Sequence, residues 1–154
     1  RTEARTMIDI GCGDLNWLGE SVGAGAVEVD AVDITPAACS TPPANISFAV
    51  LDIVSAAPRR AYDVVLCRQC LNHMQLADAQ TALRNICASG SRWLLATTYP
   101  EQEGNEGVER RAGAGTCYRT FNLERPPFDL GEAACRFADE VLHAHAHSSC
   151  PSPP

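Results

Sequence analysis

An apolar run that breaks into a glycine turn stands near the start of the chain. Residues 7–10 read as a short strand, Gly11 and Gly13 follow, and a helix pattern begins at Asn16. Glycine adopts positive φ and lets a ligand approach the backbone, and the helix after such a turn offers free amide groups. The pattern predicts either a strand, turn and helix that hold a ligand or a simple strand-to-helix turn.

An acidic residue follows the second apolar stretch. Asp33 comes after residues 27–32, where a carboxylate can accept hydrogen bonds from the two hydroxyls of a ribose. A dinucleotide-binding turn needs a small residue at the position of Asn16, and carboxylates at Asp9 and Asp14 would repel a pyrophosphate. The residues therefore favour a nucleoside ligand with a cationic centre, such as S-adenosylmethionine, over NAD.

Four further segments carry a resemblance to a known family, namely residues 8–17, 32–34, 51–53 and 62–74. They resemble successive motifs of the class I S-adenosylmethionine-dependent methyltransferases. Residues 93–100, Asn105 and residues 118–130 resemble a little-characterised bacterial-type branch with GCGDxNW and NLxxPPF motifs. The resemblance implies an α/β fold with a doubly wound, Rossmann-like, mainly parallel sheet, pared down, in three α/β/α layers. It also implies a methyltransferase domain over residues 1–130 and a C-terminal tail over residues 131–154.

The resemblance assigns roles at the cofactor site. Asp33 takes the ribose hydroxyls, Asp52 accepts from the adenine amino group, and Ile34 and Ile53 sandwich the ring. Asp9 orients the glycine turn. Asp9 and Asp52 are also open to interpretation as a turn cap and a loop cap. The predicted cofactor site comprises Asp9, Gly11, Gly13, Asp14, Asp33, Ile34, Asp52, Ile53, Cys67 and Arg68.

The methyl acceptor leaves a weaker signal, because methyl transfer depends mainly on alignment. The predicted acceptor contacts are Arg68, Asn72, Tyr99, Arg119 and Asn122. Arg68 is alternatively an ion-pair partner of Asp9 or Asp14. His73 is a weak candidate for a general base, against a packing role at a helix start; the catalytic residues are otherwise unknown. Residues 118–130 form either the acceptor side of the cleft or the last antiparallel hairpin of the sheet.

Hydrophobic periodicity predicts the elements. Strands are expected over residues 6–10, 27–32, 46–50, 62–67 and 92–98, and helices over residues 16–22 and 76–88. Alternating strands and helices imply a parallel sheet. Residues 101–115, rich in Gly and Glu, are expected to form a mobile loop and a candidate lid.

Composition bounds the partners. A formal net charge of −7 disfavours nucleic acid, and the absence of a long apolar run or a signal pattern favours a cytoplasmic protein without a membrane partner. We expect the eight cysteines to be reduced. The CxxC pair Cys67 and Cys70 lacks two further ligands, so no metal is expected. His143, His145 and His147 are expected in a solvated tail.

The sequence thus predicts S-adenosylmethionine-dependent methyl transfer to an unidentified acceptor, a small molecule or else a protein. A catalytically idle cofactor-binding or partner-binding module of the same fold is the alternative. Gln69 and Leu15 depart from the family pattern and put activity, more than fold, in question.

Overall fold

The computed structural model describes residues 3–16, 18, 27–36, 42–43, 45–107, 111–113, 116–137 and 142–146. Its strands are β1 (Thr6–Ile10), β2 (Glu28–Asp33), β3 (Ile46–Val50), β4 (Val64–Cys67), β5 (Trp93–Thr97), β6 (Arg111–Gly113), β7 (Thr116–Tyr118), β8 (Cys135–Phe137) and β9 (Leu142–Ala146). The helices whose bounds lie within the described residues are the short 3-10 helix η1 (Leu71–His73) and the α-helix α2 (Leu76–Ala88).

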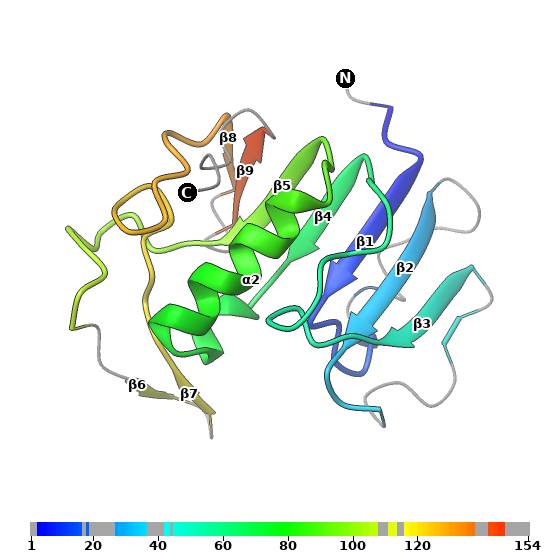
Figure 1. The fold of residues 1–154 in the computed structure, drawn as a ribbon, viewed down its shortest axis with the longest axis horizontal. Coiled ribbons are helices and arrows are strands. Elements are labelled where there is room, and N and C mark those ends of the chain that lie inside the picture. The colour runs from blue at the N-terminus through cyan, green and yellow to red at the C-terminus, as the bar shows by residue number, and fades with distance from the viewer. Residues whose placement is uncertain are drawn as a thin grey trace.

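Seven of the described strands form one sheet in the order β3-β2-β1-β4-β5-β9-β8. The first five pair in parallel, while β9 is antiparallel to both β5 and β8 (Figure 1). The order reverses between β1 and β4, and the carboxyl ends of the parallel strands meet at one edge. This arrangement confirms the predicted fold class and places a switch point where β1 ends.

Side chains of alternate residues separate the two faces of the sheet. Ile8 and Ile10 of β1 pack with Val65 of β4 and with α2, which covers the face turned towards the viewer in Figure 1. The opposite face packs Val29 and Ala31 of β2 against Cys12, Leu15 and Leu18. Both faces are therefore apolar, as a parallel sheet requires.

Helix α2 begins and ends at the residues that the periodicity predicts. Its buried face comprises Ala79, Ala82, Leu83, Ile86 and Cys87, which recur at helical spacing. Of the helix predicted over residues 16–22, Asn16 and Leu18 are helical and the rest lies outside the described residues.

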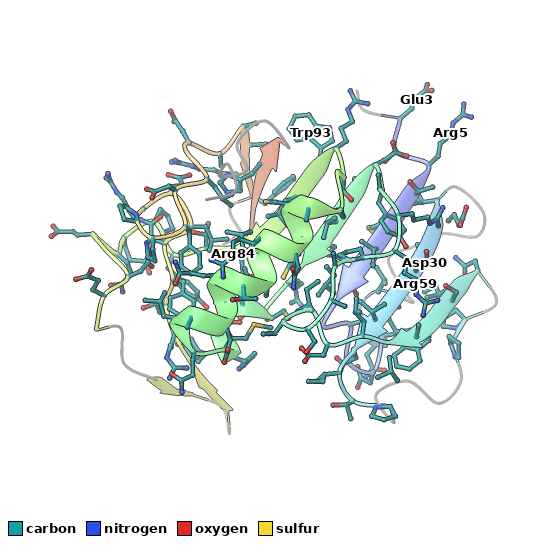
Figure 2. The ribbon with its side chains drawn as sticks, in the orientation of Figure 1. Glu3, Arg5, Asp30, Arg59, Arg84 and Trp93 are labelled. Atoms are coloured by element: carbon teal, nitrogen blue, oxygen red, sulfur yellow. The ribbon has the colours of Figure 1, made fainter. Side chains whose placement is uncertain are left out.

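Polar contacts fix the connections at the other edge of the sheet. The Asp63 carboxylate accepts from the amide of Thr6 at 3.0 Å, which holds the start of β1 beside β4. The Tyr62 hydroxyl donates to Asp30 at 2.6 Å, and the Arg60 guanidinium lies 4.6 Å from the Tyr62 ring centroid. Figure 2 places the labelled Arg5 and Trp93 at this amino-terminal edge, away from the strand ends where a ligand is expected.

The chain beyond residue 130 differs from the expected tail. β8 and β9 extend the main sheet. In β9, His145 pairs with Leu94 of β5 and is only 1% exposed. The solvated-tail prediction is therefore wrong for His145, because β9 continues the sheet beyond β5. His147 lies outside the described residues. The strand β6 falls within residues 101–115, which were expected to be a loop, and pairs with β7 in a separate two-stranded sheet.

One cysteine departs from the expected redox state. Cys87 is disulfide-bonded, and its partner is not among the free thiols Cys12, Cys67, Cys70 and Cys135. The expectation of reduced thiols is wrong for Cys87. Among the described helices, none is both long and apolar enough to cross a membrane.

Candidate functional site

A cavity of about 380 Å³ lies at the carboxyl ends of the parallel strands. Six residues proposed from sequence line it: Gly11, Asp33, Ile34, Asp52, Ile53 and His73. Sequence reasoning missed seven lining residues: Ile10, Leu51, Val54, Gln69, Cys70, Met74 and Asp78. Most of these follow β3 or β4, so the position after a strand end was the signal that could have found them.

The glycine turn after β1 is held against the end of β2. The amide of Gly11 donates to the carbonyl of Val32 at 2.9 Å, and the amide of Gly13 donates to Asp33 Oδ2 at 3.1 Å. Gly11 has a φ of 75° and Gly13 a φ of 56°, a region that glycine tolerates and other residues rarely adopt. A Cβ at Gly11 would lie only 2.8 Å from Cys70 Sγ, so the turn packs directly on Cys70.

Asp33 ends β2 with its carboxylate fixed in place. Oδ2 accepts from Gly13, and Oδ1 accepts from the amide of Thr35 at 2.8 Å. Each carboxylate oxygen can accept more than one hydrogen bond. Asp33 therefore lines the cavity in a fixed orientation and retains capacity to bind hydroxyl donors.

Asp52 follows β3 and caps its own loop. Its Oδ1 accepts from the amide of Val54 at 2.9 Å, and its other oxygen accepts from the Ser55 hydroxyl. Hydrogen bonds from Ser55 and Val54 lower the pKa of Asp52, so the carboxylate is ionised at neutral pH. The loop-cap interpretation is thus correct, and the capped residue also lines the cavity.

Two isoleucines supply apolar wall. Ile53 is buried, whereas the side chain of Ile34 is 64% exposed although it lines the cavity. Large apolar side chains left open in a cavity wall are typical of ligand sites.

Asp9 is buried in β1, two residues before the glycine turn. It is 1% exposed, and its Oδ2 has no hydrogen-bond partner. Burial raises the pKa of Asp9 to about 7, against the Arg68 charge, which lowers it. Asp9 and Arg68 are thus electrostatic neighbours, which supports the alternative interpretation of Arg68 as a partner of Asp9.

Five predicted cofactor residues do not line this cavity: Asp9, Gly13, Asp14, Cys67 and Arg68. Asp14 is exposed and accepts from the amide of Asn16 at 3.2 Å, as a helix-start cap does. Cys67 is buried at the end of β4 and shares a hydrogen bond with Cys70. Their roles at a cofactor stay predictions.

Polar groups cluster beside the cavity around Gln69. The Asn72 amide donates to Gln69 Oε1 at 2.5 Å, and both side chains hydrogen-bond to the Tyr99 hydroxyl. The Tyr99 ring stacks on Tyr118 with centroids 6.3 Å apart. Because Gln69 lines the cavity, this cluster connects two predicted acceptor residues, Asn72 and Tyr99, to the cavity wall.

Arg119 and Asn122 are buried, and their side chains hydrogen-bond to neighbouring segments of the chain. Arg119 donates to the Met74 carbonyl at 2.8 Å and to the Gln75 side chain at 2.8 Å, so it clamps the start of α2. Asn122 Nδ2 donates to the carbonyls of Pro100 and Gln102. These contacts give both residues a structural role, and their predicted contact with an acceptor stays untested. Residues 119–130 form turns rather than the last hairpin of the sheet.

His73 is exposed and lines the cavity, as does Asp78. It is therefore within the site, as a general base would be. In the part of the chain that the structure describes, no group of three or more His, Cys, Asp or Glu could hold a metal ion.

A family model described as a methyltransferase domain matches residues 7–89, more than half of the chain. The chain belongs to this methyltransferase family. The matched residues include β1 to β4, the glycine turn, Asp33, Asp52 and the whole of α2.

Solved methyltransferases share the fold of this family member. CalS10, a SAM-bound amino pentose methyltransferase from Micromonospora echinaspora, has a TM-score of 0.71 at 16% identity, over 96% of this chain and 85% of that chain. KedS8, a sugar N-methyltransferase from Streptoalloteichus sp ATCC 53650, has a TM-score of 0.66 at 14% identity, over 95% of this chain and 81% of the KedS8 chain. At these identities the likeness establishes the fold alone.

A shorter match is the N-methyltransferase NodS from Bradyrhizobium japonicum WM9, solved with S-adenosyl-l-homocysteine. It has a TM-score of 0.53 at 17% identity over 63% of this chain. This chain spans only 54% of NodS. No curated protein matches the sequence.

Proposed function

We propose that this methyltransferase-family chain binds S-adenosylmethionine in the cavity and transfers its methyl group to a small-molecule acceptor. One observation carries the proposal: the Gly11 turn, Asp33 and Asp52 follow three adjacent parallel strands and line the same cavity. As part of the proposal, the chain belongs to the class I branch with GCGDxNW and NLxxPPF motifs, and it acts in the cytoplasm. The Cys87 disulfide is unusual for that compartment.

The residues present fit S-adenosylmethionine. The Asp33 carboxylate is held by two backbone amides yet keeps acceptor capacity for ribose hydroxyls. Ile34 and Ile53 offer apolar contact to an adenine ring, and Asp52 provides an acceptor beside them. The buried, unpaired Oδ2 of Asp9 lies under the turn that would face the methionine portion. Carboxylates around the cavity also suit a cationic ligand.

When bound, S-adenosylmethionine supplies an activated methyl group on a cationic sulfur. The protein then has to bind and orient the methyl donor and the acceptor and to exclude water, which are its main contributions to such a transfer. Asp33 and the Gly11 turn bind and orient the methyl donor. Gln69, held by Asn72 and Tyr99, presents a fixed carboxamide to the cavity. His73 at the rim accepts a proton from the acceptor where the acceptor must lose one.

The acceptor is proposed only as a class. CalS10 and KedS8 are sugar methyltransferases by name, and this chain follows them over nearly its whole length. The polar cluster of Gln69, Asn72 and Tyr99 beside the cavity supports a small, polar acceptor over a protein. A protein acceptor stays the second possibility, to be separated by the labelling experiment below.

Ligand binding is tested with S-adenosylhomocysteine by calorimetry and thermal unfolding. At a hundredfold excess over its Kd, it should add about 2.7 kcal/mol to the free energy of unfolding, and NAD should add nothing. Asp33→Ala should abolish most of the effect, and Asp33→Asn should retain part of it because one acceptor oxygen remains. Glu106→Ala, an exposed carboxylate outside the cavity, is the matched control.

Methyl transfer is tested with methyl-labelled S-adenosylmethionine and separate pools of metabolites and peptides. Label in the metabolite pool supports the proposal, and label in peptides alone contradicts the small-molecule acceptor. Binding of S-adenosylhomocysteine without any transfer would favour the catalytically idle module. Tight binding of NAD in place of S-adenosylhomocysteine would contradict the whole assignment.

A further inference from the structure

One thiol of a hydrogen-bonded pair lines the cavity, and the other is buried next to it. Cys67 is the last residue of β4, and Cys70 lies at the start of η1. The two thiols share a hydrogen bond, and both are free. Cys70 lines the cavity, whereas Cys67 is 1% exposed behind it. The cavity therefore gives access to one sulfur, and the second lies against the first.

The two positions suit a stepwise oxidation. The hydrogen bond to Cys70 and burial raise the pKa of Cys67, which keeps the inner sulfur protonated at neutral pH. Cys70 is the accessible partner, and a thiolate is the form that attacks an oxidant. A CxxC spacing is also found in proteins whose thiols oxidise reversibly.

We propose that Cys67 and Cys70 are a site of reversible oxidation, at which a peroxide or a small disulfide forms a Cys67–Cys70 disulfide and weakens ligand binding in the cavity. With hydrogen peroxide, the Cys70 thiolate attacks one oxygen, the O–O bond breaks, and Cys70 becomes a sulfenic acid. The released hydroxide takes up the proton that Cys70 lost and leaves as the first water. The Cys67 sulfur then attacks Cys70, the S–O bond breaks, and the proton of Cys67 leaves with the hydroxyl as water. Two thiols and one peroxide give one disulfide and two waters.

The link to binding follows from the position of Cys70 against the glycine turn. Its Sγ would lie 2.8 Å from a Cβ on Gly11, so the two residues are in close contact. A covalent S–S bond of about 2.05 Å draws Cys70 Sγ towards Cys67 and constrains Gln69 between them. Gln69 already has a φ of 50° and lines the cavity. Oxidation therefore reshapes the wall that Gly11, Gln69 and Cys70 form. This second part rests on the proposed function.

The disulfide can be mapped directly, because Arg68 lies between the two cysteines. Trypsin separates residues 61–68 from residues 69–84, so the disulfide joins two peptides that are otherwise distinct. After gentle reduction and treatment with hydrogen peroxide, we expect this linked pair, lighter by two hydrogen atoms than the sum of the two peptides and split by dithiothreitol. Cys70→Ser and Cys67→Ser should each lack it. Cys135, an exposed free thiol, reports that the oxidant reached the protein.

Affinity is measured on the same samples by calorimetry with S-adenosylhomocysteine. The oxidised protein should bind about tenfold more weakly, and dithiothreitol should restore the affinity. Cys70→Ser is compared with itself before and after the oxidant, and its affinity should not change on treatment. This control excludes an effect through Cys87, whose state is followed in the peptide of residues 85–92.

Two results overturn the inference: oxidation of Cys135 without the linked pair, or the linked pair with unchanged affinity. If the reduced protein binds no S-adenosylhomocysteine at all, the proposed function fails and the binding half of this inference fails with it. In that case the linked peptides still decide the oxidation site independently.

Discussion

Gly11→Ala should destabilise the protein more than Gly13→Ala, although both glycines have positive φ. Their φ values are 75° and 56°, so an alanine is strained at either position. The surroundings differ. A Cβ at Gly11 would lie 2.8 Å from Cys70 Sγ and 2.9 Å from Cys70 Cβ, whereas a Cβ at Gly13 would meet nothing within 4 Å. The pair therefore separates backbone strain from steric overlap.

The magnitudes follow from these two contributions. A left-handed conformation costs a non-glycine residue about 1–2 kcal/mol, which is the full loss expected for Gly13→Ala. Overpacking adds about 1–3 kcal/mol, so Gly11→Ala should lose about 2–5 kcal/mol in total. Urea unfolding of both variants measures the difference.

A second substitution at Cys70 tests the origin of the excess. Cys70→Gly removes both atoms that an alanine at position 11 would meet, whereas Cys70→Ala removes Sγ and leaves the Cβ. Double-mutant cycles should therefore give a larger favourable coupling of Gly11→Ala with Cys70→Gly than with Cys70→Ala. Equal losses for the two glycine variants, or no coupling with Cys70→Gly, would refute the reasoning.

Three further outcomes are expected. Burial raises the pKa of Asp9 from 3.8 to about 7, so the folded protein binds more protons than the unfolded chain between these pH values. The free energy of unfolding should therefore fall by up to about 4 kcal/mol as the pH rises from about 4 to about 7. In urea titrations, Asp9→Asn should lack this fall, and the control Asp129→Asn should keep it. Asn105→Ala should lose about 3 kcal/mol in chemical unfolding, because Asn105 is bonded at 2.8 Å to both the amide and the carbonyl of Asn122; a loss no larger than that of Glu106→Ala would contradict this. Tyr99→Phe should lose about 1 kcal/mol of stability and bind S-adenosylhomocysteine unchanged, since Tyr99 lies outside the cavity wall; a weakened affinity would place it in the ligand site.

The sheet could be predicted where apolar residues dominate the strand. β1, β3 and α2 have the predicted bounds, and β2, β4 and β5 differ by one or two residues at their ends. β9 was missed because its Leu142–Ala146 segment alternates His with Ala, a pattern that indicates a polar segment rather than a buried strand. His145 is buried where β9 pairs with β5, and pairing between distant segments leaves no local pattern.

The site was predictable from the residues that directly follow strands. Gly11, Asp33 and Asp52 are set by the turn and by the strand ends, and all three line the cavity. The specific motif of residues 118–130 was harder to interpret, because a buried Asn or Arg looks the same in sequence whether it binds a ligand or a backbone carbonyl. In the structure, Asn122 Nδ2 donates to the carbonyls of Pro100 and Gln102, contacts that depend on the folded path of both segments.

The departures from the family pattern at Leu15 and Gln69 are accommodated by packing and hydrogen bonding. Leu15 adopts a φ of 62°, which costs about 1–2 kcal/mol for a residue with a Cβ. Its side chain is 3% exposed in the core beneath the turn, and burying a leucine contributes about 1.5–3 kcal/mol, enough to offset that strain. Gln69 has a φ of 50°, and its backbone N–H donates a 2.9 Å hydrogen bond to Thr97 Oγ1, which holds this conformation. The left-handed backbone at both positions is thus kept without glycine, so neither departure argues against a ligand at the turn.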